Sequence, residues 1–556
     1  MRDALARVIA LVLPLTMATP AAAQNGATAA TGTHGMVSAA HPLAADAGIA
    51  VLRAGGNAFD AAVAVAAALN VVEPNMSGIG GYGTVLVYDA RERRVHFLNP
   101  SGRIPRAVDA NAFRAPTPGW QENRHGAKAV STPGNANAWE AMWRRWGVRP
   151  WPSLFEPAVR LAEGGFPVTP ALAGAIASAW QDFPLSARAF YGREGQPLAA
   201  GDTLVQRQLG HTFRRIAANG SGVVHGGPVG VAIDSIIREA GGFLRLSDLR
   251  DNRAEWWDPI HIRYRDHDIY TAAPPANAFD ALVRLGIMSR FNVRELGHNS
   301  VSFLHRFAEA TKHGFWVRLR WAGDPEVAPP PVDSLLSPSY WAEQAATIDP
   351  SRATAFVPPD ARAEGAGHTT HFVVADRWGN IVSATQTLGN SFGARIMAPG
   401  TGVWLNNSLA YSTFEPAGNP MDAHAGRRKL SGDVPVIIMR DGRPWAALGT
   451  PGGHTIGQTV PQMVMNLIDF RMNISAALSA PRISFVEPST LAVEEALPAE
   501  VRAALEAMGH EVRAVRALGN AHGLTITWDS DGRPAEFAGA ADPRGEGVAR
   551  GLVMAR

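Results

Sequence analysis

Two threonines in one predicted hairpin carry the chemistry that can be read from this sequence. The strand-like segments 369–376 and 380–388 are joined by the loop Arg377–Gly379, and a three-residue loop ending in glycine fixes which residues face each other. In that register Thr369 faces Thr387. The sequence contains no cysteine, so covalent catalysis would use serine, threonine, lysine or a carboxylate. We interpret Thr369 as a candidate nucleophile and Thr387 as its partner, although such a cross-strand pair can also serve only to stabilise a sheet.

The elements that must position this pair change character along the chain. Residues 42–54 and 58–70 have the periodicity of helices, and residues 135–330 are expected to be mostly helical. After residue 368 the sequence changes to short strands joined by tight turns. Further hairpins are predicted at 434–449 and 524–540, with helical segments at 462–473 and 497–508 between them. A helix-rich first part and a hairpin-rich second part predict an α+β fold of packed layers with antiparallel sheet.

Composition excludes several classes of function. The chain has 556 residues, and 51 basic against 49 acidic side chains give a net charge of +2. The sequence has no block of lysines and arginines long enough to suggest a nucleic-acid partner, so none is expected. Without cysteine there can be no disulfide, cysteine-ligated zinc or iron–sulfur cluster. A Gly-x-Gly-x-x-Gly pattern at 78–83 follows a predicted helix and precedes a predicted strand, which is the reverse of a dinucleotide-binding motif.

The first 23 residues are expected to be a secretory signal peptide. Arg2 and Arg7 supply positive charge, residues 8–17 are apolar, and Ala21–Ala23 offer a cleavage site that would leave Gln24 at the mature N-terminus. The apolar segment is too short to cross a membrane, and no later segment of the sequence is long enough. We therefore predict an exported protein, periplasmic or extracellular, with no membrane anchor once the signal peptide has been removed.

A series of short motifs resembles the γ-glutamyltranspeptidase family. The segment Gly367-His368-Thr369-Thr370-His371-Phe372, followed by Asp376-x-x-Gly379-Asn380, is similar to the site at which these precursors are cleaved. Further matches follow in the family's order over most of the chain: Gly55-Gly56-Asn57-Ala58-x-Asp60-Ala61-Ala62, Thr132-Pro133-Gly134, Leu405-Asn406-Asn407, Pro451-Gly452-Gly453, Ala480-Pro481-Arg482 and Ala541-Asp542-Pro543-Arg544. Each motif alone is a weak signal, but their shared order is a strong one.

The resemblance implies an N-terminal nucleophile hydrolase with a four-layer αββα sandwich. The precursor would cut itself before Thr369 into a large subunit, residues 24–368, and a small catalytic subunit, residues 369–556, which stay intertwined as one fold. Cleavage would free the α-amino group of Thr369. Because such a group has a pKa of about 7.7 to 8, it suits a general base, and one residue would then be both nucleophile and base.

Other roles follow from position in the motifs. Thr387 would hydrogen-bond the nucleophile, and Gly452 and Gly453 would supply the backbone N–H groups of an oxyanion hole. Glycine suits this role because successive amides can turn toward one oxygen without a Cβ in the way. His368 and His371 form a His-x-x-His pair, but a zinc site needs more ligands than these. We expect no metal ion and no other cofactor.

The pocket that binds the γ-glutamyl carboxylate in the family is only partly matched. Family members hold this α-carboxylate with an arginine and two consecutive serines. Here Ser431 matches the first serine, whereas Gly432 replaces the second. Ser101 stands where the arginine would be, and Arg103, two residues on, is a candidate substitute. An uncompensated carboxylate in a pocket is costly, so this part of the pocket looks rebuilt.

The residues that hold the substrate α-amino group differ as well. The family uses Asn, Gln and Asp, and the matching positions here carry Gly389, Ser408 and Tyr411. Arg395 and Arg428 are further candidates for binding an anionic acyl group, although arginines are more often solvated surface residues. The candidate substrate-binding residues are Ser431, Asn407, Ser408, Tyr411 and Arg103.

We therefore predict an exported, self-processing amidohydrolase or acyltransferase whose acyl group need not be γ-glutamyl. Its partners would be a small-molecule amide or peptide substrate and, within the molecule, the two subunits of one precursor. Two alternatives stay open. One is a true γ-glutamyltransferase or glutathione hydrolase with substitute pocket residues, which must release product from a γ-glutamyl anilide. The other is a binding or scaffold homologue without catalysis, which would resist acylation by an electrophilic probe.

Overall fold

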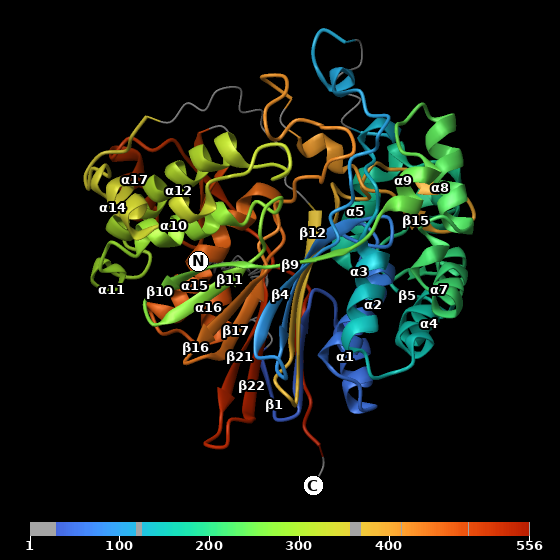
Figure 1. Cartoon of the computed structure of the whole chain (residues 1–556), viewed down its shortest axis with the longest axis horizontal. Helices are drawn as coiled ribbons and strands as arrows, with labels where there is room; N and C mark the ends of the chain where they lie inside the picture. The colour runs from blue at the N-terminus through green and yellow to red at the C-terminus, as the bar shows by residue number, and fades with distance from the viewer. Residues whose placement is uncertain (1–28, 118–124, 356–367, 413, 487–488, 555–556) are drawn as a thin grey trace, which may run out of the picture.

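Two seven-stranded sheets packed against each other form the centre of the molecule in the computed structural model (Figure 1). The structure describes residues 29–117, 125–355, 368–412, 414–486 and 489–554. The predicted signal peptide and residues 356–367, which precede the predicted cleavage site, lie outside this part of the chain. Within it, no helix combines the length and the apolar character needed to cross a membrane.

Each large sheet is antiparallel throughout. The first has the strand order β23 (Val548–Gly551), β2 (Gly35–Ala39), β12 (His368–Asp376), β13 (Ile381–Gly389), β3 (Tyr82–Asp89), β4 (Arg94–Asn99) and β9 (Glu255–Trp257). The second has the order β1 (Ala29–Gly32), β22 (Pro534–Ala541), β21 (His522–Trp528), β17 (Arg443–Gly449), β16 (Val436–Arg440), β11 (His267–Thr271) and β10 (Ile260–Tyr264). Both sheets therefore combine strands from before and after residue 368, so the two predicted subunits are interleaved.

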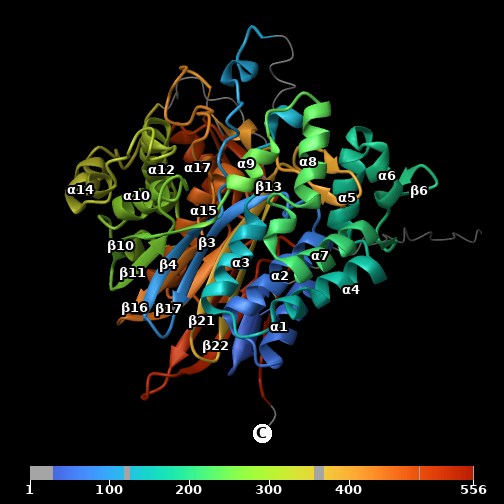
Figure 2. The same ribbon diagram turned by 45° about the vertical axis from the view of Figure 1, so that its right-hand side comes forward.

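Helices cover the outer face of each sheet, which gives four layers (Figures 1 and 2). The first sheet is covered by α1 (Pro42–Arg53), α2 (Ala58–Val72), α3 (Asn135–Trp146), α4 (Glu156–Gly164), α5 (Pro170–Ala179), α6 (Leu185–Tyr191), α7 (Arg207–Asn219), α8 (Pro228–Glu239) and α9 (Leu246–Asp251). On the other side lie α10 (Phe279–Met288), α11 (Val293–Leu296), α12 (Val301–Trp321), α13 (Val332–Leu335), α14 (Pro338–Ala346), α15 (Ile456–Ile468), α16 (Ile474–Ser479) and α17 (Ala499–Ala507). The predicted αββα sandwich is confirmed.

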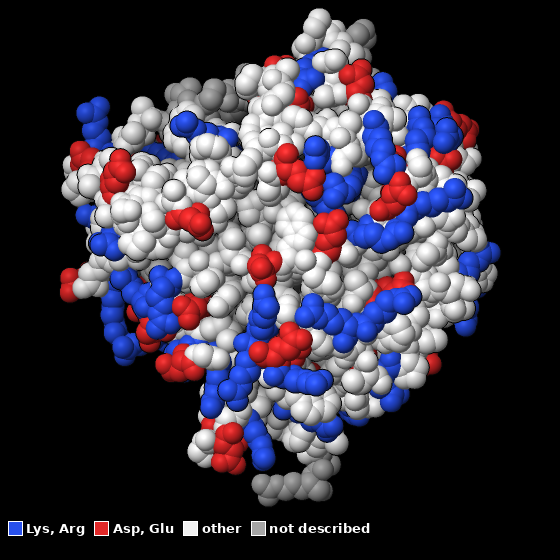
Figure 3. Space-filling model, viewed as in Figure 1, with Lys and Arg blue, Asp and Glu red and all other residues white. Residues whose placement is uncertain are grey.

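Small sheets complete the structure. Strands β18 (Ile483–Val486), β19 (Thr490–Glu494) and β20 (Val512–Val515) form one of them, and the two-stranded ones pair β14 (Met397–Ala398) with β15 (Val403–Trp404), β5 (Phe166–Pro167) with β8 (Thr203–Leu204), and β6 (Gly192–Arg193) with β7 (Gln196–Pro197). Acidic and basic side chains are intermixed over the face in Figure 3, as the small net charge leads one to expect.

Side chains of β12 alternate between the two cores. Phe372 and Val374 pack with the helices of the first layer, whereas Val373 and Ala375 point into the space between the sheets. The same alternation directs Thr369 toward the second sheet.

Local signals placed most elements correctly. The helices expected at 42–54 and 58–70 and the later hairpins are confirmed, within a few residues. The helix expected at 462–473 instead occupies Ile456–Ile468, with Pro461 inside it. It begins earlier because a short turn of 3-10 helix, Gly453–Thr455, leads directly into it.

Candidate active site

The hairpin of β12 and β13 brings Thr369 and Thr387 together as predicted. The two residues are Cα partners in the ladder, and Thr369 Oγ1 donates a hydrogen bond to Thr387 Oγ1 at 3.1 Å. Thr387 Oγ1 in turn donates to the His368 carbonyl at 2.7 Å and accepts from the Gly389 N–H at 2.8 Å. A β-bulge falls between His368 and Thr369, at the bond predicted to be cut. The hydroxyl of Thr387 therefore contacts both the predicted nucleophile, Thr369, and the His368 carbonyl that Thr369 would attack.

The far end of the hairpin is anchored to the first helical layer. The Asp376 carboxylate accepts hydrogen bonds from the backbone N–H of Ala58, at the start of α2, and from Asn380 Nδ2, at 2.9 and 2.8 Å. Burial raises the pKa of Asp376 to about 6, against these hydrogen bonds. At the other end of α2, the Thr370 hydroxyl donates to Glu73 Oε2 at 2.9 Å, and burial raises the pKa of that carboxyl to about 7. Glu73 was not among the residues predicted from sequence.

Thr369 and Thr387 line a small cavity of about 30 Å³, which is large enough for a water molecule. The chain that encloses it comes from several elements: Tyr82, Gly389, Tyr411, Lys429, Leu430, Gly432, Asp433, Gly453 and His454. This cavity is the candidate active site, because polar and charged side chains line it together with the two threonine hydroxyls.

The predicted oxyanion glycines lie where a 3-10 turn opens α15. Gly452 and Gly453 have φ angles of 139° and 59°, in the region that favours glycine. A Cβ on Gly452 would lie 2.5 Å from Thr455 Oγ1. Of the two, Gly453 lines the cavity of Thr369. Their role as donors stays a prediction, which the proximity of Gly453 to the hydroxyl pair supports.

The predicted substrate-binding residues are divided between the cavity and the structure behind it. Tyr411 lines the cavity, and its hydroxyl donates to Asn390 Oδ1. Ser431, Asn407 and Ser408 are buried, but they are not among the lining residues. The Ser431 carbonyl accepts from the Asn277 N–H at 2.6 Å, and Asn407 Oδ1 accepts from the Asn390 N–H at 2.8 Å. These contacts hold the backbone around the cavity.

The predicted arginines are engaged elsewhere. Arg103 lies 3.5 Å from Glu255 and 3.7 Å from Glu326 in ion pairs, and it is not among the residues that line the cavity. Arg428 is buried and pairs with Glu255 as well, whereas Arg395 pairs with Asp182. The structure therefore places none of these three arginines around Thr369.

Sequence reasoning missed the two charged residues that do line the cavity. The Lys429 ammonium lies 3.9 Å from the ring centroid of Tyr82 and 5.7 Å from that of Tyr411. Asp433 is buried next to the Ser431 hydroxyl, and burial raises the pKa of its carboxyl to about 6, although that hydroxyl and the charge of Lys429 oppose the rise. One available signal was the rarity of lysine, which occurs three times in the chain against 48 arginines.

His454 follows the two glycines and was also missed. Burial and the nearby Arg318 and Lys429 charges lower its pKa well below the usual value, so its ring is neutral. Arg318 Nη1 contacts His454 Nδ1. Because a guanidinium can only donate, Nδ1 is the acceptor and Nε2 carries the proton.

One cluster has the residue types of a metal site. His305 and Glu309 on α12 and His510 place candidate ligand atoms within 4.8 Å of one another. Lys312 Nζ, however, donates to Glu309 Oε1 at 2.6 Å, and the two histidines are hydrogen-bonded at 2.9 Å through His305 Nδ1. His305 Nε2 lies 2.7 Å from the Asp349 carbonyl. The cluster is thus satisfied as a network that ties α12 to neighbouring segments.

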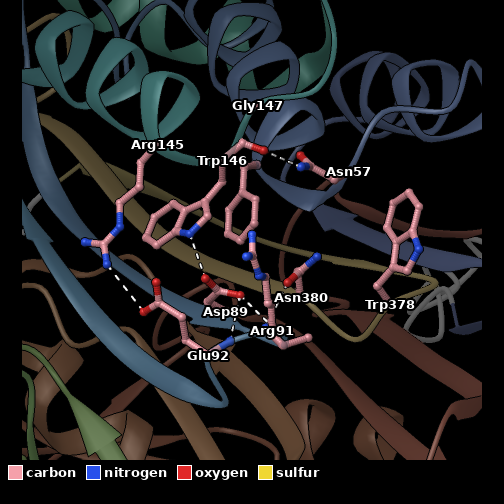
Figure 4. Close-up of a pocket in the computed structure, with 11 residues that line it drawn as sticks. Asn57, Asp89, Arg91, Glu92, Arg145, Trp146, Gly147, Trp378 and Asn380 are labelled. Atoms are coloured by element: carbon pink, nitrogen blue, oxygen red, sulfur yellow. Dashed lines mark hydrogen bonds and ion pairs between the residues drawn. The ribbon is translucent and has the colours of Figure 1, made fainter.

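A larger cavity, of about 770 Å³, lies beside the turn of the β12–β13 hairpin, and Thr369 is not among its lining residues (Figure 4). Trp146 Nε1 donates to Asp89 Oδ2 at 2.7 Å, and Asn57 Nδ2 donates to the Trp146 carbonyl at 2.6 Å. No serine, threonine or lysine is among its lining residues. Size alone would favour this cavity, but the chemistry for acyl transfer lies at the smaller one.

A four-layer αββα sandwich with a threonine pair at the start of a central hairpin defines an N-terminal nucleophile hydrolase. The chain belongs to the γ-glutamyltranspeptidase family, whose model, described as gamma-glutamyltranspeptidase, matches residues 44–552. It is 33% identical to a glutathione hydrolase proenzyme of Bacillus subtilis over 94% of this chain and 92% of that protein. It is 36% identical to an acylase ACY 1 proenzyme of a Pseudomonas species, over 92% and 95%.

A solved structure agrees with these relatives. Cephalosporin acylase from Bacillus halodurans superimposes with a TM-score of 0.86 and 29% identity, covering 97% of this chain and 99% of that one. The chain is an enzyme of this family, and the resemblance inferred from the motifs is confirmed.

Proposed function

We propose that the chain is the precursor of an N-terminal-threonine amidohydrolase or acyltransferase that cuts itself before Thr369. The products would be a large subunit, residues 24–368, and a small subunit, residues 369–556. The interleaving of strands from both parts in each sheet supports a cut molecule that stays together. The proenzyme names of the glutathione hydrolase and acylase relatives support the cleavage.

One observation carries the proposal, namely the chain of contacts from Thr369 Oγ1 through Thr387 Oγ1 to the His368 carbonyl oxygen. The donated hydrogen bond polarises the carbonyl at the bulged bond. Attack by Thr369 Oγ1 on the His368 carbonyl carbon would break the C–N bond, and the freed α-amino group would take up a proton. Water would then open the resulting ester and leave the His368 carboxylate and a free Thr369.

Turnover would use the same atoms a second time. The freed α-amino group removes the proton of Thr369 Oγ1, which attacks the substrate amide and forms a threonyl ester. The proton passes to the departing amine, and water or an acceptor amine then takes the acyl group. The N–H groups of Gly452 and Gly453 would stabilise the oxyanion, which in such sites is worth about 100- to 1,000-fold in rate.

Variants of Thr369 test this proposal. Wild-type protein should give two bands on a denaturing gel, the smaller one beginning at Thr369 by N-terminal sequencing. Thr369→Ala should abolish both cleavage and amide turnover, whereas Thr369→Ser should retain part of each. Thr527→Ala, an exposed strand threonine on β21, is the matched control and should behave as wild type. An intact chain from the wild-type gene with no amide turnover would refute the proposal.

Export is the remaining part of the proposed function. The apolar segment and small residues before Gln24 support a secreted enzyme, periplasmic or extracellular. Fractionation of the producing cells, with N-terminal sequencing of the large subunit, tests this directly. A large subunit that begins at Met1 and stays in the cytoplasm would contradict it.

A further inference from the structure

Lys429 brings a positive charge into the cavity of Thr369. Its side chain is almost fully buried, and its ammonium lies against the faces of Tyr82 and Tyr411, at 3.9 and 5.7 Å from the ring centroids. Attraction to an aromatic face stabilises a cation that has lost part of its water shell. The two rings therefore hold this charge at the wall of the cavity that also contains the nucleophile.

Position 429 carries a lysine although almost all basic residues of this chain are arginines. Only Lys128, Lys312 and Lys429 are lysines. An ammonium is a compact charge with three donors, whereas a guanidinium is a wide planar fork. A compact cation leaves more room in a small cavity, and it can meet a carboxylate from several directions.

The position of this charge also bears on what the acyl group can carry. The Lys429 ammonium lies 5.7 Å from the ring centroid of Tyr411, which lines the same cavity as Thr369. A second ammonium from a substrate would meet this charge at close range. The enzyme thus already places a cation of its own beside Tyr411.

Asp433 does not reverse this preference. Its carboxylate lies near Thr84 Oγ1, at 3.4 Å, its backbone N–H donates to Ser431 Oγ, and burial raises its pKa to about 6. The charge of Lys429 stabilises the ionised form of Asp433. Asp433 therefore opposes the charge of Lys429 only when it is ionised, and its raised pKa lets it accept a proton when a second anion arrives.

His454 adds a donor to the same cavity. Because Nδ1 faces Arg318, its N–H is at Nε2, and the residue lines the cavity together with Gly453 and Lys429. A neutral imidazole that donates can hydrogen-bond a carboxylate without adding charge.

We infer that Lys429 is a specificity residue that selects short acyl groups ending in a carboxylate and lacking a free ammonium. Monoamides of short dicarboxylic acids belong to this class. The inference rests on the proposed function. In turnover, Thr369 Oγ forms an ester with the acyl carbon, the C–N bond breaks, and the proton leaves on the amine. Water then releases the free dicarboxylate, while Lys429 holds the distal carboxylate throughout.

Three p-nitroanilides that differ by one group each test the inference on the processed enzyme. The glutaryl compound has the distal carboxylate, and the butyryl compound lacks it. The γ-glutamyl compound has the carboxylate and also an amino group on the carbon that bears it. We expect kcat/KM for glutaryl to exceed that for butyryl by roughly 100-fold, since a site built for a polar group rejects analogues without it. It should exceed that for γ-glutamyl by roughly tenfold.

Variants of Lys429 separate a specificity role from a structural one. Lys429→Met should reduce the glutaryl-to-butyryl ratio to within about threefold, and Lys429→Arg should keep part of it because the charge is retained. Lys128→Met, at a lysine outside the cavity, is the matched control. Should Lys429→Met fail to fold, Lys429→Arg still tests the residue, and competition on wild-type enzyme tests the preference itself, since free glutarate should inhibit far more strongly than butyrate or glutamate.

The outcomes are distinguishable. A processed enzyme that prefers γ-glutamyl, or whose glutaryl-to-butyryl ratio is unchanged in Lys429→Met, overturns the inference and leaves the proposed function standing. Failure of the wild-type chain to be cut at Thr369, or cleavage of none of the three anilides, overturns both.

Discussion

Two groups of buried charges lie near the candidate active site, and their partners are arranged very differently. In the first, Arg482 and Asp542 form an ion pair with both side chains fully buried, Arg544 Nη1 donates to Asp542 Oδ1 at 2.9 Å, and Arg544 Nε donates to Glu494 Oε1 at 2.6 Å. In the second, Lys429 faces aromatic rings, and Asp433 has hydroxyl neighbours.

The first group is a structural network of paired charges. Burial disfavours ionisation of Asp542, but Arg482 and Arg544 hold the pKa of its carboxyl below the usual value. The Ala521 N–H also donates to Asp542 at 3.0 Å, and the Asn520 N–H donates to Thr450 Oγ1 at 2.9 Å. Through these contacts the network supports the segment just before Gly452 and Gly453.

In the second group the pKa of the buried carboxyl shifts in the opposite direction. The pKa of Asp433 is raised to about 6, mainly by burial, and is not lowered by a close guanidinium. A charged pair whose partners are already in place contributes to the fold, whereas charges that line a cavity can exchange their neighbours for a ligand. The comparison therefore separates motif residues that maintain the backbone from residues that select the substrate.

Breaking the first group should have the largest effect on stability. Asp542→Asn would leave Arg482 buried without its counter-ion, which costs about 3–5 kcal/mol. We expect a clearly lower apparent midpoint of thermal unfolding and a reduced soluble yield. Unfolding of a large chain is often irreversible, so midpoints should be compared at one heating rate.

The matched control is the same substitution in an exposed ion pair. Arg94 and Asp258 are 2.6 Å apart, with side chains 59% and 82% exposed. Asp258→Asn should change the free energy of unfolding by about 0–1 kcal/mol, because water already solvates both charges. Equal midpoints for Asp542→Asn and Asp258→Asn would show that the buried network contributes little.

The sequence predicted the backbone of the site well, for reasons that are local. A three-residue turn ending in Gly379 sets the register that pairs Thr369 with Thr387, and the Asn57–Asp60 capping box sets the start of α2. Turn chemistry and helix caps act over a few residues, so they can be read along the chain. The αββα architecture needed the ordered motifs as well.

The charges of the pocket could not be predicted in this way. Arg103 was favoured because it lies two residues from a motif position, but the structure pairs it with Glu255 and Glu326, from distant segments. Lys429 reaches the cavity only because the chain before Gly432 folds against Tyr82. Such contacts depend on tertiary packing. The sequence alone does not show which of the many arginines and lysines forms an ion pair with a given carboxylate.

The pH dependence of specificity should distinguish the second group from the first. Below about pH 6 Asp433 is neutral and adds no negative charge near Lys429, so an anionic acyl group binds well. As the pH rises through about 6, Asp433 ionises and repels the anion. The glutaryl-to-butyryl ratio of kcat/KM should therefore fall roughly tenfold between about pH 5 and about pH 8, equal to about one pKa unit of interaction.

The ratio isolates Asp433 from the other titrating groups of the enzyme, and the glutaryl carboxylate, with an ordinary pKa of about 4.3, is already mostly ionised at about pH 5. Ionisation of the Thr369 amine affects both substrates alike, His454 is neutral over this range, and Thr84 and Ser431 do not titrate. Asp433→Asn should give a ratio that is high and independent of pH. A wild-type ratio that does not change with pH, or that rises, would contradict this role of Asp433.

The smallest expected effect concerns the aromatic wall that holds Lys429. A cation over an aromatic face gains about 0.5–2 kcal/mol, so replacing Tyr82 by leucine should lower the glutaryl-to-butyryl ratio by about threefold. Tyr82→Phe keeps the ring face and should preserve the ratio, which makes it the matched control. If both variants lower the ratio equally, the Tyr82 hydroxyl and not its ring positions Lys429. If neither variant lowers the ratio, Tyr82 does not position Lys429, and other residues that line the cavity hold its charge in place.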